Sequence, residues 1–177
     1  MIMKDGLVFF GEYASIVRQL IHSGMFESMW QIPCIAPIIG IVEGQKGNRK
    51  ISNDDRAKVL PDEINSHYDE IIFAYRIVML LNEDKPVEER KENAFIYYDK
   101  FNDEDREFNS RVNRNYRTFM QYLYGGIDIL YEKLIAGNLD VNNEVTNKEE
   151  FIKSSMKYLT ELMEENNNKE LNADLFE

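Results

Sequence analysis

The stretch from Tyr116 to Leu134 constrains the fold of this chain more than any other segment. It combines a dense cluster of aromatic residues with the only adjacent pair of glycines in the sequence, Gly125 and Gly126. Apolar residues on both sides recur at helical spacing, and two glycines either allow a positive φ or let a second helix approach closely. The pattern predicts a helix–Gly-Gly–helix element, in which one helix breaks at Gly125 and Gly126 and a second helix follows, and around which the rest of the chain is organised.

Helical periodicity also dominates the remaining sequence. Apolar residues at helical spacing predict helices over residues 12–21, 26–42, 61–82, from 86 to about 95, from about 103 to 124 and from 147 to 163, whereas residues 7–10 alone fit a short strand. The predicted fold class is all-α, a single-domain bundle of about five to seven helices with a buried central helix. Residues 1–165 form the predicted domain, and residues 166–177 form an acidic, Asn-rich tail that we expect to be flexible.

The segment from Phe26 to Val42 is the best candidate for the central helix. It is nearly uncharged after Glu27, and a helix that is apolar on all sides is usually buried. Pro33 suits a first helical turn, whereas Pro37 removes a backbone hydrogen bond and predicts a kink. Three other positions mark helix starts: Pro61 in a first turn, and Thr146 with Glu149 at capping-box spacing.

The charge of the chain limits the partners that it can bind. With 21 basic and 32 acidic side chains, the formal net charge is −11, which argues against nucleic-acid binding by the whole surface. The balance reverses locally, since residues 41–60 carry five basic and three acidic side chains. A local basic patch or a basic protein partner remains compatible with this pattern.

The chain has few residues that could form a metal or thiol site. Cys34 is the only cysteine, so no intrachain disulfide forms and a reducing compartment is expected. Cys34 lies in the apolar segment, where burial favours an inert thiol, and a structural role is expected for His22 and His67. No cofactor or metal is predicted. The N-terminus lacks a signal-peptide pattern and the longest apolar stretch is too short to span a bilayer, so we expect a cytoplasmic protein.

Two groups of basic residues are the candidate binding residues. Arg111, Arg114 and Arg117 recur every three residues, so they predict a basic ridge on one helix. Such a ridge could bind phosphates or the acidic side chains of a partner protein. The alternative is that these arginines form ion pairs with acidic residues one turn upstream. The second group is a loop that contains Lys46, Arg49 and Lys50. This loop follows a helix, and a helix C-terminus attracts cations by its dipole, so the loop could also be basic for this structural reason alone.

Three segments of the chain resemble a known bacterial family. The first segment runs from Gly24–Ser28 through Ala36–Gly40 to a basic turn at Gly44–Arg49. The second is an apolar helix over Ile71–Leu81. The third, Tyr122–Leu130, has the pattern Tyr-x-x-Gly-Gly-x-x-Ile-Leu. Together these segments resemble the Dnd system-associated protein 4 family, small proteins that accompany bacterial DNA-phosphorothioation and phage-defence loci. The resemblance covers roughly residues 20–135. Pro33, Pro37 and the C-terminal helix depart from the family pattern.

The resemblance implies a non-enzymatic accessory, sensor or adaptor subunit of an anti-phage defence complex, and no catalytic residues. Such a subunit would contact other proteins of the system and could hold DNA or RNA through a local basic patch. It would not bind a membrane. The charge of −11 leaves open an acidic DNA mimic, or a phage-encoded inhibitor of a nuclease. A third alternative is a carboxylate-metal nuclease whose acidic residues converge from separate helices.

Overall fold

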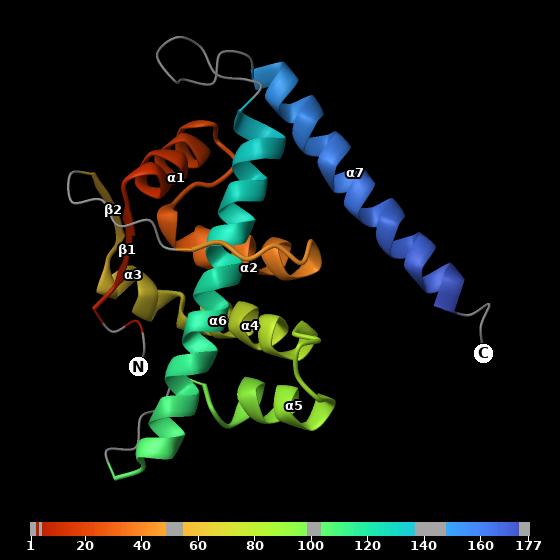
Figure 1. The fold of residues 1–177 in the computed structure, drawn as a ribbon. Helices are drawn as coiled ribbons and strands as arrows, with labels where there is room; N and C mark the ends of the chain where they lie inside the picture. Colours follow the sequence, from red (N-terminus) through yellow and green to blue (C-terminus); the bar gives the residue numbers. More distant parts are fainter. Residues whose placement is uncertain (1–2, 4, 49–54, 99–103, 137–147, 174–177) are drawn as a thin grey trace.

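A computed structural model describes residues 3, 5–48, 55–98, 104–136 and 148–173 (Figure 1). Seven α-helices and one two-stranded sheet make up these residues, which confirms the predicted all-α class. The core joins residues from every part of the chain up to α7. Its largest fully buried side chains include Phe9, Tyr13, Leu20, Ile32, Ile64, Met79, Phe119, Leu123, Ile127 and Leu134.

Helix α6 (Arg106–Leu130) runs the length of the molecule and contacts most of the other α-helices (Figure 1). It begins at Asp105, whose side chain accepts a hydrogen bond of 2.9 Å from the backbone N–H of Phe108. A π-helical turn, η2 (Tyr131–Ile135), continues it without interruption. The helix passes straight through Gly125 and Gly126, so the predicted break at the diglycine is wrong.

The diglycine instead allows a second helix to approach closely. Helix α2 (Ile32–Val42) packs across α6, and a methyl group on Gly126 would lie 1.7 Å from the carbonyl oxygen of Ala36. The converse contact is as close, because a methyl group on Gly40 would lie 2.1 Å from the carbonyl oxygen of Tyr122. Two backbones at this distance exclude any side chain, and this exclusion explains why glycine stands at both positions.

Helix α2 is central, as predicted, but it begins later than the sequence pattern suggested. A 3₁₀ turn, η1 (Met29–Gln31), precedes it, Pro33 lies in its first turn and Pro37 lies inside it. The prolines and Ala36 are buried or half-buried toward the core, whereas Ile35 is 42% exposed. The helix is therefore not buried on all sides.

The N-terminal part of the chain forms a strand and a helix. Strand β1 (Leu7–Phe10) precedes α1 (Glu12–His22), and β1 pairs antiparallel with β2 (Arg56–Val59) so that Leu7 lies opposite Val59. The sequence did not predict β2. A four-residue strand leaves little periodic signal, and its pairing partner lies about fifty residues away in the chain.

Helices α3 (Pro61–Ser66), α4 (Tyr68–Leu81) and α5 (Val87–Phe95) follow. The sequence predicted one helix over residues 61–82. It is divided at His67, whose backbone leaves the helical region at φ −119° and ψ 27° and whose ring stacks on Trp30 with 3.5 Å between the centroids. Pro61 occupies the first turn of α3, as expected.

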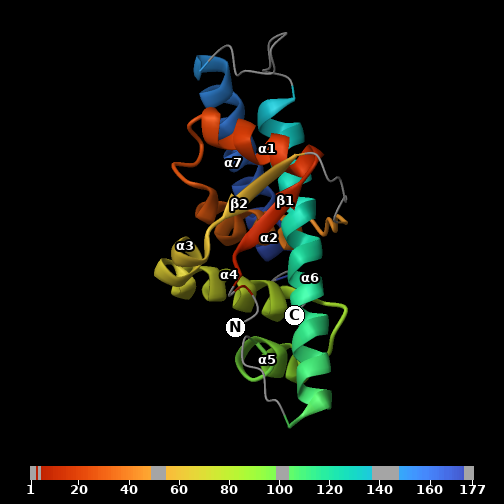
Figure 2. The same cartoon turned by 90° about the vertical axis from the view of Figure 1, so that its left-hand side faces the viewer.

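Helix α7 (Lys148–Ala173) lies apart from the sheet and extends away from the body (Figures 1 and 2). It contacts the body mainly near η2. The helix includes residues 166–173, which the sequence assigned to a tail, while residues 174–177 and the capping residue Thr146 lie outside the described part. None of the helices within the described residues is both long enough and apolar enough to cross a membrane.

Candidate nucleic-acid or partner interface

The N-terminal half of α6 carries a polar face whose lining residues all belong to α6. Its residues line an open surface hollow of about 360 Å³ and are spaced three or four apart along the helix. They are Arg106, Asn109, Ser110, Asn113, Arg114 and Arg117. We call this set the arginine–asparagine face. It contains no carboxylate, which is unusual on a chain with a net charge of −11.

Arg117 lies where this face meets the rest of the molecule. Its side chain is exposed, and it also lines a second hollow of about 490 Å³ between β1 and α6. Asn48 and Gln121 supply further polar groups to that second hollow, and Leu7 and Met120 supply apolar surface. Arg117 is therefore the residue that connects the arginine–asparagine face to the loop after α2.

Glycines hold this loop against α6. The backbone N–H of Gly47 donates to the carbonyl oxygen of Gln121 at 2.8 Å, and a methyl group on Gly125 would lie 2.0 Å from the carbonyl oxygen of Gln45. The diglycine thus fixes both α2 and the loop that follows it. As a result, the described part of the loop, residues 46–48, lies beside the C-terminal end of the arginine segment at Arg117, although about seventy residues separate the two in the chain.

Within the loop, Lys46 is already engaged. Its ammonium group forms an ion pair of 2.6 Å with Asp84 and lies 5.1 Å from the centroid of the Tyr122 ring. The hydrogen bond to Asp84 raises the pKa of Lys46 and lowers the pKa of Asp84. Lys46 therefore joins the end of α2 to the end of α4. Arg49 and Lys50, the other two predicted residues of the loop, lie outside the described residues.

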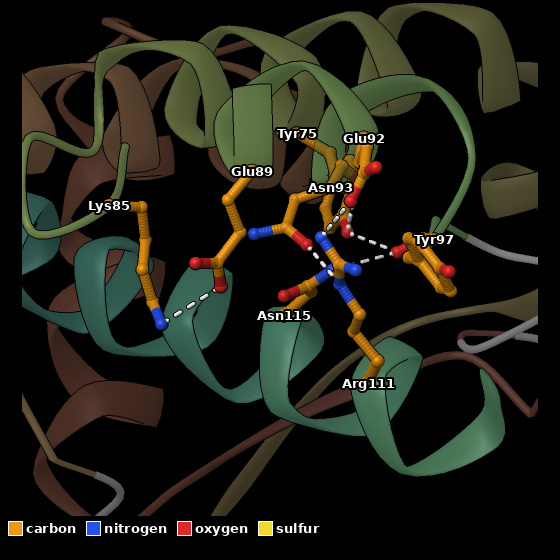
Figure 3. Close-up of polar contacts among 8 residues, drawn as sticks. All are labelled: Tyr75, Lys85, Glu89, Glu92, Asn93, Tyr97, Arg111 and Asn115. Carbon is orange, nitrogen blue, oxygen red and sulfur yellow. Dashed lines mark hydrogen bonds and ion pairs between the residues drawn. The ribbon is translucent and has the colours of Figure 1, made fainter. Parts of the chain in front are cut away.

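Arg111 points away from the arginine–asparagine face and toward α5 (Figure 3). Its Nε donates to Asn93 Oδ1 at 2.8 Å and its Nη2 donates to Glu92 Oε2 at 2.8 Å. The guanidinium also lies 3.9 Å from the centroid of the Tyr97 ring. This set of contacts makes Arg111 a clamp between two helices, so it is not available as a ligand-binding residue in this arrangement.

The groups around Arg111 are themselves closely satisfied (Figure 3). The carbonyl oxygen of Tyr97 accepts hydrogen bonds from Tyr75 Oη at 3.0 Å and from Asn115 Nδ2 at 2.9 Å. Asn93 and Asn115 are both buried. This network joins α4, α5 and α6, and it explains why Asn115 serves the core while Asn113, two residues earlier, faces solvent.

Arg114 and Arg117 remain on the exposed face. Arg114 Nη1 donates to Ser110 Oγ at 3.0 Å, one turn upstream. Both arginines line the hollows on either side of α6. The predicted ridge of three arginines is only partly separated. All three line a hollow of about 250 Å³ that Lys85 and Glu89 also line, whereas only Arg114 and Arg117 belong to the arginine–asparagine face, because a three-residue step rotates about 60° short of a full turn on an α-helix. Two members face solvent and one faces a neighbouring helix.

The two histidines and the cysteine do not form a further site. His67 stacks on Trp30, and Cys34 donates a weak hydrogen bond of 3.5 Å to the carbonyl oxygen of Trp30. Burial raises the pKa of the Cys34 thiol to about 12. Among the residues that the structure describes, no three His, Cys, Asp or Glu side chains are grouped so that they could hold a metal ion.

Sequence reasoning missed several members of the face. Arg106, Asn109 and Ser110 were not among the candidate residues, nor were Asn48 and Gln121. A signal for the first three was present, since polar residues with donor groups recur at 106, 109, 110, 113 and 117 while apolar residues occupy the opposite side. Nothing in the sequence indicated that Asn48 would lie beside Arg117.

Comparison of the chain with protein-family models, with curated proteins and with solved structures finds no match. The resemblance to the Dnd system-associated protein 4 family therefore rests on the residues quoted for it alone. Its diglycine segment is the part with an evident structural role, because that segment holds α2 and its loop in place.

Proposed function

We propose that this protein is a non-enzymatic, cytoplasmic subunit of a bacterial anti-phage defence complex that contacts the phosphate backbone of duplex DNA through the arginine–asparagine face of α6. The family resemblance supports the setting. The observation that carries the DNA contact is the composition of that face, in which Arg106, Arg114 and Arg117 are exposed and no carboxylate lines the hollow.

The chemistry of the face suits a polyphosphate. Guanidinium groups bind phosphate oxygens with paired N–H donors, and asparagine and serine side chains commonly donate to phosphates as well. Arg106 and Arg117 are separated by about 16 Å along the helix axis, at 1.5 Å per residue. That length fits several consecutive phosphates of one DNA strand better than it fits a single small anion.

Backbone contact is favoured over base recognition. The six residues of the face include no aromatic ring on which an unpaired base could stack. The acidic remainder of the surface repels DNA, so the contact would be local and strongly dependent on salt. A protein of this kind would hold DNA only when partner subunits contribute further contacts, which fits an accessory role.

The test is fluorescence anisotropy with a labelled duplex of about 20 base pairs at several salt concentrations. Three arginine–phosphate contacts predict a slope of log K against log salt of about −2.7. The double variant Arg114→Glu/Arg117→Glu should bind at least about tenfold more weakly at low salt, with a slope reduced toward about −1.

A matched control changes the same number of charges elsewhere. Lys91 and Lys133 are exposed and lie outside the face, so Lys91→Glu/Lys133→Glu should weaken binding by less than about threefold. Equal losses in the two variants would show that only net charge matters. The DNA proposal would fail if the unmodified protein did not bind duplex DNA at low salt.

Membership of a defence complex has a separate test. An affinity-tagged copy expressed in the native host should co-purify with proteins encoded beside its gene. The same face can serve an acidic protein surface, and in that case Arg114→Glu/Arg117→Glu would release a protein partner while leaving the amount of bound DNA unchanged. Recovery of the tagged chain with no neighbouring gene product would contradict the proposed setting.

A further inference from the structure

Helix α7 carries a stripe of large apolar side chains that its own fold leaves exposed. Ile152, Met156, Leu159 and Met163 are 55%, 64%, 56% and 68% exposed. We call these four residues the outer stripe. They have the size and character of core residues, and four of them in a row on one helix form a continuous apolar surface rather than scattered single residues.

A different stripe of α7 contacts the body of the protein. Ser155 and Tyr158 are buried there, and Leu162 packs against the core. Tyr158 Oη donates to Glu43 Oε1 at 3.2 Å. At 100° per residue the outer stripe lies about a quarter of a turn around the helix from this contact line. The fold therefore uses one apolar stripe and presents the neighbouring one to solvent.

The spacing of the outer stripe is that of a helix-pairing seam. Its members are separated by four, three and four residues, which is the alternation of the a and d positions in a coiled coil. The body-facing residues Ser155, Tyr158 and Leu162 show the same alternation, so this spacing is that of a helix face that packs on another surface. A second helix can therefore pack along the outer stripe.

We propose that the outer stripe pairs with the outer stripe of a second copy of this chain, with the two α7 helices antiparallel. In this arrangement Met156 lies against Leu159 of the partner subunit, and Ile152 lies against Met163 of the partner subunit. The contact is isologous, so one patch suffices and the assembly closes at a dimer.

Charge selects a second copy and its direction. The exposed charged residues beside the stripe are Lys153 and Lys157 in its first half and Glu161 and Glu164 in its second half. Within one helix Lys153 pairs with Glu149 at 2.8 Å and Lys157 lies 3.7 Å from Glu161. An antiparallel copy brings the basic half of one helix to the level of the acidic half of the other. A parallel copy places like charges at the same level, which is unfavourable.

The small size of the seam sets the strength of the dimer. Four side chains per copy over about 16 Å of helix cover less than the roughly 800 Å² per partner of a standard interface. We expect a reversible dimer with a dissociation constant of about 1–100 µM. Two copies would present two arginine–asparagine faces, although the pairing itself does not depend on DNA binding.

Sedimentation equilibrium of the full chain, without nucleic acid, tests the pairing. The unmodified protein should show a monomer–dimer equilibrium, and Met156→Glu/Leu159→Glu should weaken it by more than about tenfold with an unchanged circular dichroism spectrum. Phe73 is 61% exposed on α4, so Phe73→Glu is the matched control and should leave the equilibrium unchanged. A chain that is monomeric at about 200 µM, or a dimer that the double variant leaves intact, would overturn the proposal.

Disulfide trapping tests the direction of the two helices. In a Cys34→Ser background, Ile152→Cys alone should form little disulfide dimer, whereas an equimolar mixture of Ile152→Cys and Met163→Cys chains should cross-link on oxidation. Cross-linking of Ile152→Cys with itself at the rate of the mixture would instead indicate a parallel pair and would reject the antiparallel arrangement.

Discussion

The two halves of helix α6 have opposite uses, although one uninterrupted helix contains both. In the C-terminal half most residues from Phe119 to Leu130 are buried, and Gly125 and Gly126 bring the backbones of α2 and its loop into contact with it. In the N-terminal half, one side packs on α5 through Arg111 while the other side exposes Arg114 and Arg117. One half organises the core, and the other presents donor groups to solvent.

The difference shows that helix formation and helix function are set by separate features of the sequence. Both halves have the apolar periodicity of a helix. Their roles differ because the first half has a polar face opposite an apolar one, whereas the second half is mostly small or apolar, with Gln121 and Asp128 as its strongly polar residues. Substitutions in the C-terminal half should therefore change stability, and substitutions on the exposed face should change binding.

The largest expected effect is at the diglycine. Gly126→Ala places a methyl group 1.7 Å from a backbone oxygen of α2, so α2 must move away, and we expect a loss of about 3–5 kcal/mol in the free energy of unfolding. Chemical denaturation followed by circular dichroism measures it. Gly24 has open space around it and a φ of +81°, so Gly24→Ala should cost only about 1–2 kcal/mol.

An effect of intermediate size is expected at the clamp between α5 and α6. Arg111→Ala removes two hydrogen bonds of 2.8 Å and leaves the buried side chain of Asn93 without its guanidinium partner. We expect a loss of about 2–3 kcal/mol in the free energy of unfolding. Arg114→Ala is the matched control one turn further on, and it should change stability by less than about 0.5 kcal/mol. Equal effects would contradict the division of roles on this helix.

The smallest effect on stability at neutral pH is expected at Cys34, where the quantity to measure is the reactivity of the thiol. Because burial raises the pKa of Cys34 to about 12, the folded protein should react with a disulfide reagent at pH 8 at least about a hundredfold more slowly than the unfolded chain, whose thiol pKa is about 8.5. The raised pKa contributes stability that is fully present below about pH 8.5 and is lost as the pH rises toward 12.

The same thiol reports on the packing of α2. If Gly126→Ala displaces α2, its Cys34 should become more accessible and should react faster under native conditions. An unchanged reaction rate in that variant would mean that α2 keeps its position and that another part of the molecule absorbs the added methyl group.

Much of the fold could be predicted from local sequence signals, and the exceptions have physical causes. Pro61 marked the start of α3, and the spacing of apolar residues marked α4 and α5 as helical, because capping and periodicity act within a few residues. The break at His67 was missed because its cause is tertiary, the stacking of its ring on Trp30. Strand β2 was missed because the strand it pairs with, β1, is distant in the chain.

The candidate interface was only partly predictable for a similar reason. The sequence identified Arg114 and Arg117, which do lie on the exposed face, together with Arg111 and Lys46, which the fold engages in contacts with Asn93, Glu92 and Asp84. Nothing distinguishes these arginines and lysines before folding, because each carries the same charge and a similarly long side chain. The neighbours that engage them come from other helices.

The sequence by itself determined the helical class of this protein, the apolar character of α2, the acidic surface and the concentration of arginine in α6. These properties follow from composition and from spacing within one or two turns. Only the tertiary structure decided that the diglycine is a place of close approach and not a break, since a glycine permits both and the position of Ala36 selects between them. It also decided which arginines stay exposed, because a long cationic side chain binds whichever acceptor the packing of neighbouring helices brings within reach.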